Sequence, residues 1–149
     1  MSLGESDIKA FQYTALPARV LFGFGTIAKV ADELVSLGRK RAFVLSDPHH
    51  AATAAAQLMR VLGDLGVHLS TDAVMHTPVE VTERVMEKLA ACNADCIVAL
   101  GGGSTIGLAK ALALRTDLPQ IVLPTTMRAR RPRRCSARRA RGKKRRFAR

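Results

Sequence analysis

The sequence predicts an α/β fold in which a mostly parallel sheet carries helices on both faces. Short apolar runs alternate with segments of helical periodicity from residue 19 to residue 123. That alternation is typical of strands joined by helical crossovers. A sharp change of charge also separates residues 1–127, which carry the alternation, from a basic segment, 128–149. We therefore expect one α/β domain followed by a tail.

Composition agrees with this division. The 149 residues are 48% hydrophobic, which is enough for one domain with its own core. Residues 1–127 hold 11 basic and 12 acidic side chains, whereas residues 128–149 hold 13 basic and no acidic ones. The formal charge of +12 therefore comes from the tail alone. Whole-chain charge says nothing about the partners of the α/β domain.

Five elements are expected in the first half of the domain. A short strand at 19–22 precedes a helix over 26–37, whose apolar residues recur at helical spacing. An apolar run at 41–45 predicts a buried strand, and a second helix fits 51–65. Each helix is followed by a glycine, the usual residue past a helix C-terminus. A further strand is expected within 67–74.

The next helix has a start signal of its own. Thr77 is a good N-cap, Pro78 suits the first helical turn, and Glu80 stands where a capping box needs its carboxylate. Apolar residues continue this pattern as far as Leu89. Strands are then expected at 96–100 and 120–123, which are the last two apolar runs.

A glycine run between these two strands carries the chemistry. The apolar strand 96–100 ends in three glycines and two hydroxyl residues, and a helix continues to residue 113. Glycines let a diphosphate approach the backbone, and the amide groups and dipole of the helix start favour its charge. The alternative is a glycine turn that only packs the helix against the strand. The candidate anion-binding residues are Gly101, Gly102, Gly103, Ser104 and Thr105.

A second candidate follows the strand 41–45. Asp47 would lie at the same carboxyl edge of the sheet, where an acid can accept hydrogen bonds from a ribose and repel a 2′-phosphate. The alternative is an Asx turn ahead of Pro48. The histidines show no metal-ligand spacing and are expected in turns or on the surface, with His76 a second-tier site candidate: His49, His50, His68 and His76.

The cysteines favour a reducing compartment. Cys92, Cys96 and Cys135 are odd in number and do not form a CxxC pair, and Cys96 opens an apolar run, so we expect it to be buried. The N-terminus lacks a signal-peptide pattern, and no apolar stretch is long enough to cross a bilayer. We expect a cytoplasmic protein without membrane contact.

The segment IVALGGGSTIGLAKALALRTDLPQIVLPTT, residues 97–126, resembles the NAD(P)H-binding half of the iron-containing alcohol dehydrogenase superfamily, and within it the maleylacetate reductases. The likeness covers about residues 10–126 and includes RVLFG at 19–23 and Met75-His76. It implies a Rossmann-like N-terminal domain of the dehydroquinate synthase type, joined in that family to an all-helical C-terminal domain. The active site of the family lies between the two.

The resemblance also implies a reaction. Maleylacetate reductases use NADH or NADPH to reduce the carbon–carbon double bond of maleylacetate, a dicarboxylate, to 3-oxoadipate in aromatic degradation. They generally need no metal and are often homodimers. By resemblance, the pyrophosphate would be held by Gly102, Gly103, Ser104 and Thr105, the cofactor cleft would be lined by Thr125 and Thr126, and the adenosine ribose would lie near Asp47.

The sequence departs from this family after Thr126. No helical domain follows, so the catalytic residues are unknown and we expect this chain alone to be inactive. The family usually continues Tyr-Ala-Gly-Ser-Glu where this chain has Met127. One choice of codons for 127–132 spells Tyr-Ala-Gly-Ser-Glu-Ala when a single T is restored. We therefore interpret 128–149 as a disordered frameshift product.

Three alternatives stay open. The tail could be a genuine arm that binds polyanions nonspecifically through its 13 positive charges. The domain could belong to a metal-dependent alcohol or glycerol dehydrogenase, whose metal ligands would lie in the helical domain. It could also be a non-enzymatic nucleotide-binding module.

Overall fold

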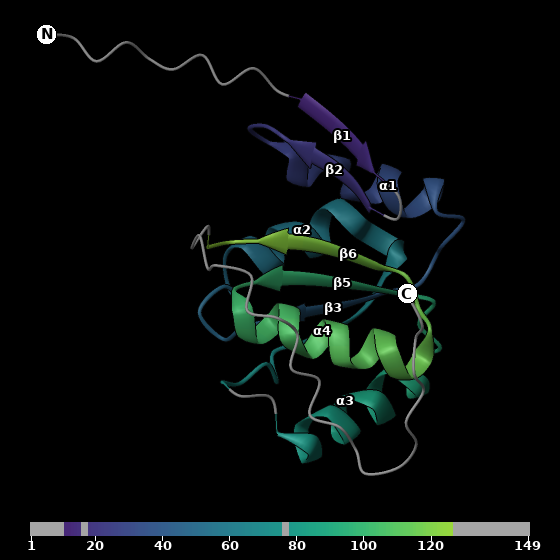
Figure 1. Cartoon of the computed structure of the whole chain (residues 1–149), viewed down its shortest axis with the longest axis vertical. Coiled ribbons are helices and arrows are strands. Elements are labelled where there is room, and N and C mark those ends of the chain that lie inside the picture. The colour runs from purple at the N-terminus through teal and green to yellow at the C-terminus, as the bar shows by residue number, and fades with distance from the viewer. Residues whose placement is uncertain (1–10, 16–17, 76–77, 127–149) are drawn as a thin grey trace, which may run out of the picture.

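A four-stranded parallel sheet forms the centre of the domain (Figure 1). The computed structural model describes residues 11–15, 18–75 and 78–126. The sheet has the strand order β4-β3-β5-β6. Its strands are β3 (Ala42–Ser46), β4 (Gly66–Ser70), β5 (Cys96–Gly101) and β6 (Gln120–Pro124). α1 (Val30–Ser36) precedes β3, and the connections between the strands of the sheet contain α2 (Ala54–Leu62), α3 (Val79–Ala91) and α4 (Gly103–Thr116).

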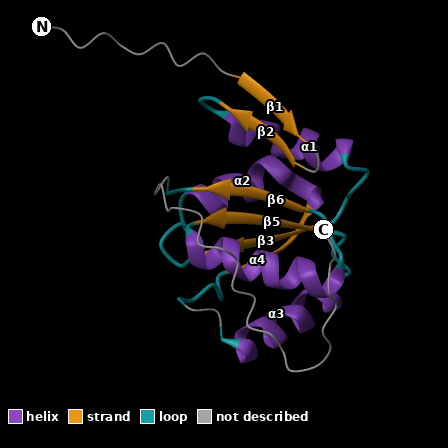
Figure 2. Cartoon of the chain, in the orientation of Figure 1, coloured by secondary structure: helices purple, strands orange, loops and turns teal. Residues whose placement is uncertain are grey.

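Helices cover both faces of this sheet, as the sequence predicts (Figure 2). Successive residues of a strand point to opposite faces, so each central strand serves two cores. Val44 and Val98 pack with α1 and α2, whereas Phe43 and Ile97 pack with α3 and α4. Every residue of β3 and β5 is buried. This explains why both strands are continuous apolar runs rather than alternating ones.

A small antiparallel hairpin lies apart from the central sheet, on the side that carries α1 (Figure 1). It pairs β1 (Phe11–Ala15) with β2 (Ala18–Phe22). The strand predicted at 19–22 is therefore confirmed, but its partner was missed because FQYTA lacks an apolar run. Arg19 in β2 pairs with Glu33 in α1 at 3.3 Å, which links the hairpin to the helix.

Two predicted helices begin differently from the expectation. The first starts as a 3₁₀ turn over Thr26–Lys29 before α1 takes over. The second, expected from residue 51, begins at Ala54 because residues 47–53 form turns instead. It ends in a 3₁₀ turn, Gly63–Leu65, after which β4 starts at once. The elements therefore match the prediction in kind and differ at their ends.

The capping box predicted for the third helix is wrong. The N-cap of α3 is Pro78, without a side-chain capping bond, and Thr77 lies outside the described residues. The backbone of Pro78 is extended, with φ −58° and ψ 151°, and its carbonyl accepts the first helical bond from the amide of Thr82 at 3.2 Å. A proline in that conformation suits the residue before a helix, so α3 starts one residue later than predicted.

Cys96 and Cys92 provide a test of this core. Cys96 is fully buried in β5, and burial, with the nearby charge of Asp95, raises the pKa of its thiol to about 12. Cys92, at the end of α3, is only half-buried. Because the thiolate is the reactive form, we expect maleimide to label Cys92 in the native chain and Cys96 only after unfolding in urea. Peptide mass mapping reads out each cysteine separately. Native labelling of Cys96 at the rate of Cys92 would contradict the packing of β5.

Candidate functional site

The carboxyl ends of β5 and β6 meet where α4 begins. The amide of Thr125 donates to the carbonyl of Gly101 at 3.0 Å, which joins the end of β6 to the end of β5. A Cβ added to Gly102 would lie 3.3 Å from Oγ1 of Thr126. The structure therefore brings the glycine run together with Thr125 and Thr126. This is the edge of a parallel sheet at which ligands of open α/β folds bind.

Gly101 leaves room that two other candidate residues use. A Cβ on Gly101 would collide with Oγ1 of Thr105, would lie 2.9 Å from Cβ of Thr105, and would lie 3.1 Å from Oδ2 of Asp47. The missing side chain thus lets α4 and the turn after β3 approach the same backbone position. Asp47 and Thr105, 58 residues apart in the chain, converge there.

The start of α4 has the properties of an anion site. Gly102 is the N-cap, no side-chain capping bond is made, and no acidic residue stands in the first turn. The amide groups of the first helical turn have no carbonyl within the helix to bond. A Cβ on Gly103 would meet no atom of the described residues within 4 Å, so the space beside this backbone is open. These donors and the helix dipole favour a negatively charged group.

One buried hydroxyl in this turn has no hydrogen-bond partner among the described residues. Thr105 is 1% exposed, and no atom of the described residues hydrogen-bonds to its Oγ1. A buried polar atom without a partner costs free energy, and such atoms are rare in native proteins. Thr105 therefore offers an unused hydrogen-bonding group next to the glycine run. The residues present fit a diphosphate, which supplies acceptor oxygens for the hydroxyl and the amides.

Asp47 is held by its neighbour His50. Nδ1 of His50 lies 2.8 Å from Oδ1 and 2.9 Å from Oδ2, and the backbone amide of His50 donates to Oδ1 at 3.0 Å. Burial acts to raise the pKa of Asp47, but the hydrogen bonds and charge of His50 outweigh it and hold this pKa below its ordinary value. Asp47 therefore stays ionised. It also organises the turn ahead of α2 by accepting a hydrogen bond from the backbone amide of His50, three residues along the chain.

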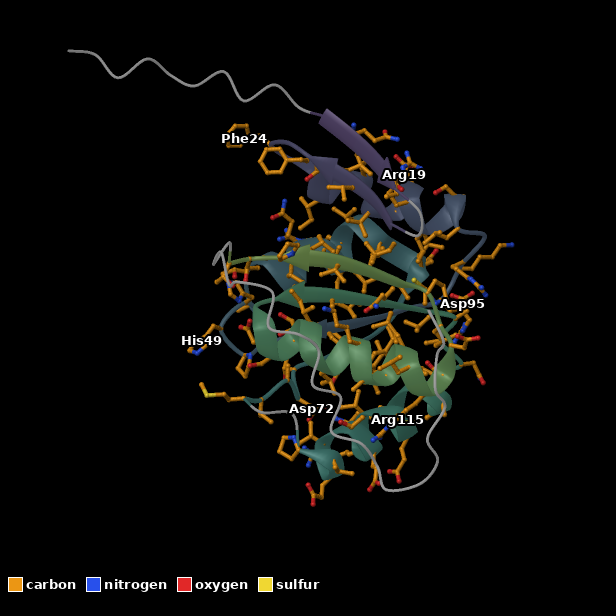
Figure 3. All side chains as sticks on the ribbon, in the orientation of Figure 1. Arg19, Phe24, His49, Asp72, Asp95 and Arg115 are labelled. Atoms are coloured by element: carbon orange, nitrogen blue, oxygen red, sulfur yellow. The ribbon has the colours of Figure 1, made fainter. Side chains whose placement is uncertain are left out.

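Of the other three histidines, two lie away from the glycine run and one falls outside the described residues. His49 is exposed and points away from the domain (Figure 3). His68, in β4, stacks on the ring of Phe43 at 5.1 Å. His76 falls outside the described residues. Over residues 11–15, 18–75 and 78–126, no three His, Cys, Asp or Glu residues could hold a metal ion.

The sequence predicts a turn or surface position for His50 and does not predict its bond to Asp47. The three-residue spacing between an acid at a strand end and a histidine in the following turn is the signal that could have indicated it.

Within the described part of the chain, no helix is long and apolar enough to cross a membrane.

Asp72 forms a separate group of polar contacts, which serves the fold. Asp72, after β4, binds Lys88 of α3 at 2.7 Å and the hydroxyl of Ser70 at 2.5 Å (Figure 3). These hydrogen bonds, the one from Lys88 first, hold the pKa of Asp72 below its ordinary value of 3.8. The cluster fixes the connection between β4 and α3 against that helix.

Asp72→Asn is therefore expected to lower the free energy of unfolding at neutral pH by about 1 kcal/mol. A lowered native pKa stabilises the fold above the unfolded pKa, and this contribution is lost as pH falls through the native pKa. Urea unfolding should thus show a gap between wild type and variant near neutrality that closes in acid. Asp64→Asn, at an exposed position, is the control and should show no gap. A gap for Asp72→Asn that persists unchanged in acid would contradict this account.

The α/β domain of this chain is similar to known proteins. The model of the iron-containing alcohol dehydrogenase family matches residues 17–130. Maleylacetate reductase from Rhizobium sp. (strain MTP-10005) is 56% identical over 119 residues, which are 80% of this chain and 34% of that protein. Maleylacetate reductase from Sphingobium indicum is 52% identical over 78% of this chain and 32% of its own length.

Solved structures agree. The crystal structure of maleylacetate reductase from Agrobacterium tumefaciens superposes with a TM-score of 0.71 at 52% identity, over 80% of this chain and 34% of that one. The chain thus spans about a third of the length of these relatives. The expected α/β class is confirmed, and the matched region contains the glycine run.

Proposed function

Because the chain belongs to the iron-containing alcohol dehydrogenase family, we propose that residues 1–127 are the NAD(P)-binding domain of an NAD(P)H-dependent oxidoreductase of the maleylacetate reductase type. The observation that carries the proposal is the glycine turn at the end of β5. Among the described residues, this turn presents a helix start without a side-chain cap, open space beside Gly103 and a hydroxyl on Thr105 without a hydrogen-bond partner. A pyrophosphate uses all three features.

Each site residue has a proposed part in binding. Gly102, Gly103 and Ser104 supply backbone amides and a hydroxyl to the pyrophosphate, while Gly101 keeps space for Thr105 below them. Asp47, ionised at the same edge, accepts hydrogen bonds from the adenosine ribose. The remaining proposed contacts of the cofactor are the residues after β6, Thr125 and Thr126.

The proposed substrate is maleylacetate, reduced at its carbon–carbon double bond to 3-oxoadipate. Support comes from the name that several relatives share at 40–56% identity. The bound nicotinamide would supply the hydride, and this domain would hold and orient the dinucleotide. Since the chain spans about a third of those relatives, we assign no substrate-binding or proton-donating residue to it. We also propose that the chain consists of an α/β domain over 1–127 and a basic tail over 128–149, as the change of charge indicates.

The proposal is tested by titrating the 149-residue chain with NADH and NADPH. The chain has no tryptophan, so binding is followed by the fluorescence of the reduced nicotinamide itself. We expect saturable binding that persists at high salt, because attraction of the anionic dinucleotide to the basic tail would be screened. Leu114→Ala, at an exposed position in the last turn of α4, is the matched control and should bind as wild type does. Binding that disappears with salt would assign it to the tail and overturn the proposal.

The tail calls for a separate experiment on the source DNA. Resequencing across the codons for 125–149 is expected to show one missing base, after which the frame encodes a helical domain. The restored chain should then reduce maleylacetate. Histidine ligands for a metal in that domain would favour the alcohol or glycerol dehydrogenase alternative. A frame confirmed as written would make the tail a genuine polycationic segment, whose polyanion binding should weaken steeply with salt.

A further inference from the structure

One side of α3 carries acidic side chains that have no partner among the described residues. They follow one another at a spacing of three and then four residues, which places them on the same side of the helix. All are exposed, and no salt bridge or side-chain hydrogen bond joins them to a described residue. We call these residues the acidic face of α3: Glu80, Glu83 and Glu87.

The basic side chains of α3 do not neutralise this face. Arg84 stands four residues after Glu80, which is the spacing of a helical ion pair, but its guanidinium lies 3.9 Å from the carboxylate of Asp72. Lys88 binds the same carboxylate at 2.7 Å. Both cations of the helix are thus turned toward the connection that follows β4. The acidic face keeps its negative charges uncompensated at neutral pH.

The other acidic side chains of the described residues are paired or stand alone. Asp47 and Asp72 have the partners described above. Glu33 pairs with Arg19 at 3.3 Å, and Asp95 accepts hydrogen bonds from two backbone amides. The remaining exposed acids lie in different parts of the fold: Asp32, Asp64 and Asp117. Among the described elements, α3 is therefore the one on which unpaired negative charges gather.

The basic segment of the same chain has the opposite charge and is long enough to reach this face. Residues 128–149, outside the described residues, hold 13 basic and no acidic side chains. They come shortly after Thr126, at the carboxyl edge of the sheet, and α3 also begins on the carboxyl side of a strand, β4. α3 and α4 cover the same face of the sheet and share one core (Figure 1). An extended chain spans up to ~3.5 Å per residue, and a helix of 13 residues is only ~20 Å long.

We propose that the acidic face of α3 is the docking surface for residues 128–149 of the same chain, and that this contact competes with external polyanions for the basic segment. Within one chain, the two partners meet at an effective concentration of about millimolar order, which favours this contact over contact between chains. Exposed ion pairs are individually weak, so the contact depends on several charges at once and is screened by salt. The proposal does not depend on the dinucleotide site.

Two native cysteines can report the contact. Cys92 follows the last residue of α3 and is half-buried, whereas Cys135 belongs to the basic segment. Cys135 comes nine residues after Thr126, a span of up to ~30 Å that exceeds the length of α3. Cys96 is fully buried and does not compete for the reagent. A short bis-maleimide should therefore join Cys92 to Cys135 within one chain at low salt, as read by peptide mass mapping. The yield should fall steeply at high salt.

Two triple variants of the 149-residue chain test the role of the acidic face. The first replaces all three of its residues: Glu80→Gln, Glu83→Gln and Glu87→Gln. The matched control changes the net charge equally at isolated exposed acids: Asp32→Asn, Asp64→Asn and Asp117→Asn. We expect the first variant to lose the cross-link and the control to keep it. The first should also bind a short double-stranded DNA roughly fivefold more tightly than the control, because its basic segment is no longer shared with α3.

Equal cross-linking of the two triple variants, or equal affinity for DNA, would overturn the proposal. Cross-links formed chiefly between chains would assign the acidic face to the basic segment of a second copy, and would overturn docking within one chain. If the first variant unfolds, as judged by circular dichroism, the double variant Glu83→Gln and Glu87→Gln takes its place. It should show smaller changes of cross-linking and of DNA affinity in the same direction.

Discussion

Gly101→Ala is expected to lower the free energy of unfolding by about 3 kcal/mol and to abolish dinucleotide binding. The added methyl group would collide with Oγ1 of Thr105 and lie 2.9 Å from its Cβ, closer than real Cβ atoms approach other carbons. Thr105 belongs to α4 and is only 1% exposed, so its side chain has no room to move away from the added methyl group. Relief requires α4 to shift away from β5, which opens the core between them. Urea unfolding and NADH titration measure the two effects.

Gly103→Ala is the matched control two residues later. A Cβ there would meet nothing within 4 Å, and alanine is the better helix former, so stability should stay the same or rise by up to about 1 kcal/mol. Binding should nevertheless weaken, because the methyl group enters the space proposed for the pyrophosphate. A Gly101→Ala variant as stable as Gly103→Ala would contradict the close packing at the end of β5. Full binding by Gly103→Ala would place the anion elsewhere.

Much of the fold follows from periodicity, because buried parallel strands and amphipathic helices leave different patterns. β3 and β5 are apolar throughout, and the helices between the strands show helical spacing. The β1–β2 hairpin could not be predicted in the same way, because its first strand mixes aromatic and polar residues. The strand order β4-β3-β5-β6 was also beyond the sequence, since it depends on which crossover lies on which face.

The candidate site was predictable to the extent that it lies at strand ends. Asp47 and the glycine run each follow an apolar strand, and parallel strands place such positions at one edge. Partners within the site were not predictable, since the bond between Asp47 and His50 depends on the local turn. The burial of Thr105, by contrast, is predictable from the sequence. Its position shares helical spacing with the buried residues of α4, namely Leu108, Ala109 and Leu112.

Thr105→Val separates the two uses of that buried position. Valine keeps the shape of threonine and removes a hydroxyl that has no partner among the described residues. Burying an unpaired hydroxyl costs about 1–3 kcal/mol, so the free energy of unfolding should rise, by about 1 kcal/mol after allowance for relaxation. Affinity for NADH should fall by roughly tenfold, since one hydrogen bond to a charged ligand is lost. A residue that serves the fold alone would not change stability and affinity in opposite directions.

Thr105→Ser is the complementary variant, and it distinguishes a hydroxyl that serves the fold from one that binds the ligand. Serine retains the hydroxyl and loses one buried methyl group, so stability should fall by about 1 kcal/mol while affinity stays near that of wild type. Unfolding midpoints in urea and NADH titrations on the same three proteins give the full pattern. If Thr105→Val is destabilised and binds NADH normally, the hydroxyl serves the fold and not the ligand. If valine stabilises and serine binds, the buried hydroxyl is maintained at a cost to stability because the dinucleotide uses it.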